Sequence, residues 1–202
     1  MLFFSTKKYL RDLANLNSMK YIYRLAGLQD YMFSTAAENI EMIAYSAVSF
    51  FVPFLLAHPQ ILVGIVVNAM LITAALNLKG YRLLPVIMLP SIGVLTAGLI
   101  FGPLSVYLIY FIPFVWIGNA ILVFSFKLFK LQKKLNYIIT LVLGAALKSG
   151  FLFLCAYILV SLSVVPSMFL TAMGMLQVVT ALGGGAAAYG LHYSKKYLAR
   201  KS

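Results

Sequence analysis

Apolar residues dominate six long stretches of this chain, and polar residues gather in the short segments between them. We place the stretches at about 38–57, 60–78, 82–101, 104–126, 136–160 and 166–192. A helix needs about 20 apolar residues to cross about 30 Å of hydrocarbon, and each stretch meets or approaches that length. The pattern predicts an all-α integral membrane protein, a compact bundle of six transmembrane helices.

Prolines interrupt three of the predicted helices. Pro53, Pro90 and Pro113 have no N–H to donate, so we expect each to kink its helix and to free backbone carbonyls that need another partner. Pro166 suits the first turn of the last helix.

The lysines and arginines fall on one side of the predicted bundle. All but one of the 16 lie in the N-terminal segment, the second loop, the fourth loop that includes Lys127, or the tail. The loops near 57–60, 101–103 and 161–166 contain none. By the positive-inside rule both termini are cytoplasmic, which six spans also require. We expect a plasma-membrane protein whose basic residues meet anionic lipid headgroups.

Three regions follow from this pattern. Residues 1–33 form a cytoplasmic, amphipathic helical segment, residues 34–194 the six-helix transmembrane domain, and residues 195–202 a basic cytoplasmic tail. The first segment is interpreted either as a helix lying on the inner leaflet or as a docking surface for a cytoplasmic partner. It lacks the apolar stretch of a cleavable signal peptide, so we expect the first span to direct insertion.

Composition excludes several classes of protein. The chain is 63% hydrophobic and 10% charged, with a mean hydropathy of +0.98, too apolar for a soluble domain. Its net charge of +12 lies beside membrane spans, so we expect no nucleic-acid partner. The single cysteine, Cys155, falls inside an apolar helix, which excludes an intrachain disulfide and a cysteine metal site.

Acidic residues are confined to the start of the chain. Asp12, Asp30, Glu38 and Glu41 are the four, all at or before the cytoplasmic start of the first span. A proton-driven pump normally relays charge through buried carboxylates or histidines, and hydrolysis or metal binding would need them as well. There is no phosphate-binding loop. We therefore expect neither an enzyme nor a metal or cofactor site.

Polar side chains recur near the middle of several spans. The candidate ligand-binding residues are Asn68, Ser91, Asn119, Lys148, Gln177 and Thr180. Exposing such groups to lipid costs up to several kcal/mol each, so we expect them to converge inside the bundle. They either fasten helices together, at under about 1 kcal/mol per hydrogen bond, or form a ligand pocket, which the contribution of five helices favours.

Lys148 is the exception to the distribution of basic residues. It lies about 20 Å along its helix from Lys134, near the middle of the membrane, and no acidic residue follows it in the chain. Three explanations remain open: a neutral amine, a bond to carbonyls freed by proline, or an anionic group on a ligand.

Small residues mark candidate packing faces, because they allow helices in lipid to approach closely. These faces serve either packing within the chain or docking of a second membrane subunit. The candidate docking residues are Ala37, Ala44, Ala47, Gly93, Ala97, Gly183 and Ala187.

Several strings, in this order and spacing, resemble the substrate-binding S component of energy-coupling factor (ECF) transporters. They are 64-GIVVNA-69, 89-LPSIG-93, 112-IPF-114 with 118-GNA-120, 144-GAALK-148 and 175-MLQVVTA-181. The resemblance covers most of residues 38–192 and is closest to poorly characterised members of that group.

The resemblance implies a function. An S component captures a small micronutrient from outside and associates with a membrane coupling protein and two cytoplasmic ATPases, which drive uptake. The family's first helix often carries an Ala-xxx-Ala face for the coupling protein, whereas Ala37, Ala44 and Ala47 are not regularly spaced. The alternative is a membrane scaffold or interaction protein that transports nothing and whose polar core is structural.

Overall fold

The computed structural model describes residues 18–30, 34–56, 59–98 and 106–199, with side chains up to residue 194. Every regular element in these ranges is a helix. A helix over residues 18–26 comes first. The labelled elements are α2 (Thr35–Leu55), α3 (Gln60–Asn77), η1 (Gly80–Arg82), α4 (Leu83–Ala97), α5 (Leu108–Ser125), η3 (Phe126–Gln132), α6 (Tyr137–Ser161), α7 (Met168–Met173) and α8 (Met175–Ala199).

Five helical segments among the described residues are long and apolar enough to cross a membrane. They are α3, η1 with α4, α5 with η3, α6, and α7 with α8. The chain is therefore a multi-pass helical membrane protein, as the hydrophobic pattern predicts. The element α2 has 21 residues but is not among the five, and it carries Glu38 and Glu41 near its start.

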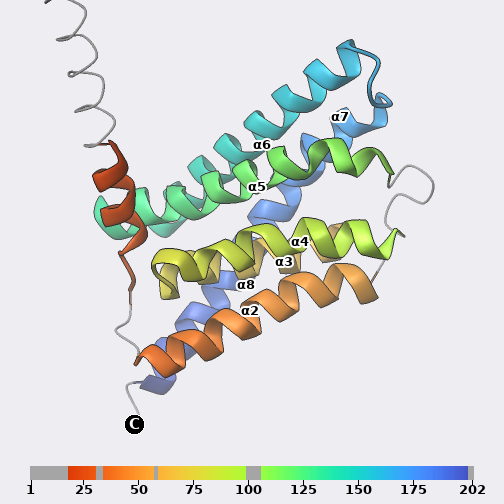
Figure 1. Cartoon of the computed structure of the whole chain (residues 1–202). Helices are drawn as coiled ribbons and strands as arrows, with labels where there is room; N and C mark the ends of the chain where they lie inside the picture. The colour runs from red at the N-terminus through yellow and green to blue at the C-terminus, as the bar shows by residue number, and fades with distance from the viewer. Residues whose placement is uncertain (1–17, 31–33, 57–58, 99–105, 200–202) are drawn as a thin grey trace, which may run out of the picture.

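The helices run side by side in one bundle, and the two ends of the bundle differ (Figure 1). The helix over residues 18–26, the start of α2 and the end of α8 lie at one end, which we call the basic end. The connection from α6 to α7 lies at the opposite end. The basic tail predicted to begin at residue 195 begins within α8, because this helix continues to Ala199.

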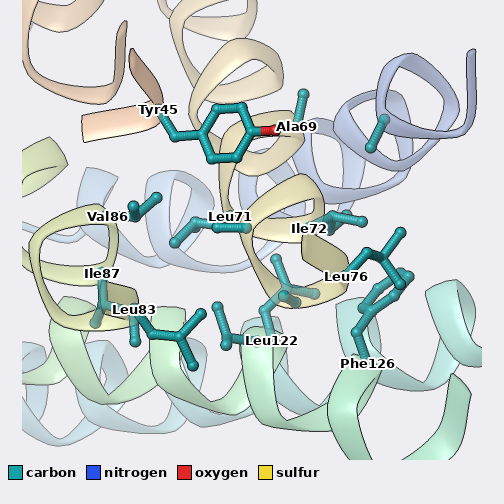
Figure 2. Packing of buried hydrophobic residues seen from close by; sticks show 14 of the residues in the cluster. Tyr45, Ala69, Leu71, Ile72, Leu76, Leu83, Val86, Ile87, Leu122 and Phe126 are labelled. Atoms are coloured by element: carbon teal, nitrogen blue, oxygen red, sulfur yellow. The ribbon is translucent and has the colours of Figure 1, made fainter. Parts of the chain in front are cut away.

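The central helix of the bundle is α3. Every residue from Leu71 to Leu78 is buried, so this part of the helix is enclosed on all sides. Figure 2 shows side chains of α3 meeting Val86 and Ile87 of α4, Leu122 of α5 and Phe126 of η3. A helix segment with no exposed side needs neighbours all round, which explains why apolar residues occur on every side of it.

The outer surface of the bundle is apolar as well. On α6 the buried positions follow a single stripe, and the opposite face exposes large apolar side chains such as Ile138, Val142, Leu147 and Leu154. In water a surface of this kind would drive association, whereas in lipid it meets hydrocarbon.

Glycines bring two pairs of helices into close contact. A Cβ added to Gly184 of α8 would lie 2.7 Å from the carbonyl oxygen of Ile65 on α3, and one added to Gly93 of α4 would lie 2.5 Å from that of Phe50 on α2. A Cβ on Gly183 would also meet the Ile65 side chain, at 2.9 Å. Gly93 and Gly183 thus pack against helices of their own chain.

The alanines of the docking prediction lie nearer the surface. Ala44 and Ala187 are exposed, and Ala37, Ala47 and Ala97 are partly buried.

One basic residue differs from its predicted environment. The sequence places Lys127 in a cytoplasmic loop, but that prediction is wrong: α5 continues as the π-helical η3, and Lys127 is fully buried. Its Nζ donates to the carbonyl oxygens of Leu28 and Leu78. Because Leu78 caps α3, the ammonium satisfies a carbonyl at the negative end of a helix dipole.

Residues 18–30 pack against the basic end of the bundle. Leu25 and Ala26 are buried, the amide of Asp30 donates to the Leu76 carbonyl (2.8 Å), and the Asp30 carboxylate pairs with His192 (3.2 Å). This part of the predicted N-terminal segment therefore contacts the transmembrane helices directly. Residues 1–17 and 31–33 lie outside the described ranges.

A buried carboxylate stabilises the same end. Glu38, 1% exposed, pairs with Lys79 (3.0 Å) and Arg82 (2.9 Å). Arg82 also donates to Oδ1 of Asn39 (2.8 Å), so the first turn of α2 is joined to η1. A buried carboxylate with two cationic partners is well compensated for the water it loses.

The close contact between α3 and α8 gives a direct test of the packing. We expect Gly184→Ala to destabilise the protein by about 1–3 kcal/mol, because the added methyl group would overlap the α3 backbone. The control is Gly190→Ala in the same helix, where a Cβ meets nothing within 4 Å. Thermal unfolding in detergent should show a lower Tm for Gly184→Ala alone; equal Tm values would contradict the packing.

Candidate functional site

Lys148 lies inside the bundle, on the buried stripe of α6. Lys148 is only 2% exposed. Nζ donates to Oδ1 of Asn68 on α3 (2.6 Å) and to Oδ1 of Asn119 on α5 (2.9 Å). Within the described chain, its partners are side-chain amides and not the backbone carbonyls that the sequence offered as one explanation.

The two asparagines are held so that their oxygens face the lysine. Nδ2 of Asn68 donates to the Gly64 carbonyl (2.9 Å) and to Oγ1 of Thr180 (3.2 Å), while Nδ2 of Asn119 donates to the Ile87 carbonyl (2.9 Å). Each amide group therefore has at least one N–H directed to another helix and its oxygen left for Nζ. We call Lys148, Asn68, Asn119 and Thr180 the Lys148 cluster; it joins α3, α5, α6 and α8.

A second polar pair lies beside Pro90 in α4. Oγ of Ser91 donates to the Met88 carbonyl (2.9 Å), and Nε1 of Trp116 on α5 donates to Ser91 Oγ (2.7 Å) and to the same carbonyl (3.1 Å). Side chains of α5 thus bind carbonyls of the turn that precedes Pro90, Trp116 at Met88 and Asn119 at Ile87.

The six predicted ligand-binding residues line one cavity. Its volume is about 130 Å³, and Asn68, Ser91, Asn119, Lys148, Gln177 and Thr180 all lie on its wall. The rest of the wall is mainly aliphatic and aromatic, with Val67, Phe111 and Val115 among its residues. Of the described residues on this wall, Lys148 is the one with an ionisable side chain.

The last predicted span is broken beside this cavity. α7 ends at Met173 and α8 begins at Met175, with Gly174 between them at φ −101° and ψ −95°. A Cβ on Gly174 would lie 2.8 Å from the Leu170 carbonyl oxygen and 2.8 Å from the Phe153 ring, so this position favours glycine. Interrupted helices at membrane depth are tolerated where they line a cavity, and Ala172, Met173 and Gln177 do so here.

Several wall residues are absent from the sequence prediction. Gln60 and Gly64 share the face of α3 that carries Asn68, since each is four residues from the next. A Cβ on Gly64 would lie 2.6 Å from the Thr180 side chain, so the glycine makes room for that residue. This four-residue spacing was the signal available in the sequence. Trp116 of α5 also supports the wall, because it donates a hydrogen bond to Ser91.

The described residues contain no group of three or more His, Cys, Asp or Glu able to hold a metal ion. No family model, curated protein or solved structure matches this chain. The function is therefore inferred from the residues of the cavity and from the distribution of charge along the chain.

The hydrogen bonds of the Lys148 cluster predict unequal effects of two substitutions on stability. Asn119→Leu leaves a buried cation with one acceptor and the Ile87 carbonyl without its donor, and we expect a loss of about 1–3 kcal/mol. Lys148→Met leaves two amide oxygens unpaired but removes the cost of burying a cation, so the effects offset each other. Thermal unfolding in detergent should give the lower Tm for Asn119→Leu. The reverse order would contradict the hydrogen bonding described above.

Proposed function

We propose that this protein is the substrate-binding membrane subunit, or S component, of an ECF-type transporter. It captures a small micronutrient from outside the cell, and partner subunits drive uptake with ATP. The observation that carries the proposal is the cavity of about 130 Å³, whose wall combines a buried lysine with polar groups of several helices. Small-molecule sites are typically apolar hollows with a few convergent polar groups, often between the helices of a bundle.

The proposed topology has six spans, namely α2 and the five segments described above, and it places both termini in the cytoplasm. The support for this orientation is the concentration of lysine and arginine at the basic end. The cavity then opens toward the outside, because its wall extends from Lys148 to Gln60 at the start of α3 and Leu108 at the start of α5. The basic end would face anionic lipid headgroups in the plasma membrane.

The partners in this proposal are a membrane coupling protein and cytoplasmic ATPase subunits. Ala44 and Ala187 are the exposed members of the candidate docking set and are suited to close helix contact in lipid. Gly93 and Gly183 are already in contact with helices of their own chain.

A membrane scaffold is the second candidate, and one observation favours it. Lys148, Asn68, Asn119 and Thr180 already bond to one another, so a purely structural role is consistent with the same geometry. Purification of the full chain from its native membrane separates the two. A transport subunit should bring down a coupling protein and ATPases and should retain a small molecule detectable by mass spectrometry. Absence of both would favour the scaffold.

Lys148→Met tests the role of the cavity in that preparation. We expect the variant to insert and to bind the retained molecule about 10- to 100-fold more weakly, because it loses one hydrogen bond to a charged group. Gly150→Ala is the control: it lies two residues away on the same helix, and its Cβ would meet nothing within 4 Å. If Lys148→Met retains the small molecule as well as the wild-type protein does, Lys148 does not take part in binding it.

A further inference from the structure

The chemistry of the cavity narrows the class of molecule it can hold. In its protonated form the Lys148 side chain has three N–H donors, and the described chain engages two of them, at Asn68 and Asn119. The remaining donor belongs to a side chain on the cavity wall. A ligand acceptor placed there would make a hydrogen bond with a cation in a site largely shielded from water, where such bonds are strong.

The charge on the cavity wall further limits which charge the ligand can carry. Lys148 is the ionisable residue on the described wall, and the other polar wall residues are neutral amides and hydroxyls. One buried cation is matched by one negative charge, whereas a phosphate dianion would bring a second charge with no cation to meet it. A cationic ligand would be repelled by Lys148.

Size and polarity set the rest of the ligand. At about 130 Å³ the cavity is slightly smaller than the engineered apolar cavity of about 150 Å³ that binds benzene. Its walls near Phe111, Val115 and Met173 offer apolar contact to a ring or a short chain. Gln177, at the start of α8, presents an amide on the wall that has no hydrogen-bond partner among the described residues and can serve a second polar atom.

We propose that the cavity binds a compact monocarboxylate, whose carboxylate accepts from Lys148 and whose small apolar body packs against α5 and α7. This inference rests on the transport role proposed above and adds the substrate class. It excludes nucleotides and other multiply charged phosphates, amines, and molecules much larger than one ring. The lysine is the group that discriminates, and the two asparagines position it.

Matched probes test this class on the purified full-length protein. Benzoate and benzamide share a ring and differ in charge, as do hexanoate and hexanamide, and benzylammonium carries the opposite charge. Isothermal titration calorimetry at neutral pH should show at least one carboxylate binding tenfold or more tightly than its amide, and benzylammonium more weakly than either. Lys148→Met should abolish the preference for the carboxylate, while Gly150→Ala should keep it.

Two outcomes of these titrations would contradict the proposal. If neither carboxylate binds better than its amide to the wild-type protein, the substrate class is wrong, and this comparison does not depend on the folding of any variant. If Lys148→Met retains the preference, the lysine does not recognise the carboxylate, and the proposal also fails. Copurification of ATPases from the same membranes reports separately on the transport role, so the substrate class and the transport role can fail independently.

Discussion

The amino group of a lysine buried among apolar helices needs hydrogen-bond acceptors, and this requirement constrains the centre of the structure. The acceptors are Oδ1 of Asn68 on α3 and Oδ1 of Asn119 on α5. Each asparagine is oriented in turn by donating to another helix, Asn68 to the Thr180 hydroxyl and Asn119 to the Ile87 carbonyl. Moving α3, α5 or α6 would break at least one of these bonds, each costly to leave unmade in a medium without water.

The same arrangement leaves space at the centre of the bundle. Gly64 and Gly184 allow α8 to approach α3 closely, which brings Thr180 to Asn68, while the break at Gly174 directs the chain around the cavity. Close packing on one side and a hollow on the other are thus consequences of small residues at particular positions. A polar cluster that borders a hollow is suited to binding a molecule, in addition to fastening helices.

Much of the fold and of the site could be predicted from the sequence, for physical reasons that apply to particular residues. The lengths of the apolar stretches fix the approximate helix positions, and the cost of exposing polar groups to lipid requires Asn68, Asn119 and Lys148 to point inward. The buried state of Lys127 could not be predicted, because a lysine at the end of a span is usually exposed on the cytoplasmic side, and its acceptors, the carbonyls of Leu28 and Leu78, are far away in the sequence.

Other features depend on tertiary contacts that one sequence does not encode locally. Glycine is frequent in membrane helices, so a single glycine in an apolar run, such as Gly174, does not signal a break. Small residues such as Gly93 and Gly183 give the same pattern whether they pack inside the chain or against a partner, and here they pack inside.

The measurement that bears most directly on the central claim is an experimental density map of the full chain in lipid nanodiscs, with an antibody fragment added for size. The account predicts Nζ of Lys148 at hydrogen-bonding distance from Oδ1 of both Asn68 and Asn119, beside an open or ligand-filled cavity reaching Gln177. A lysine directed toward the acyl chains, or a centre filled by side chains, would contradict it.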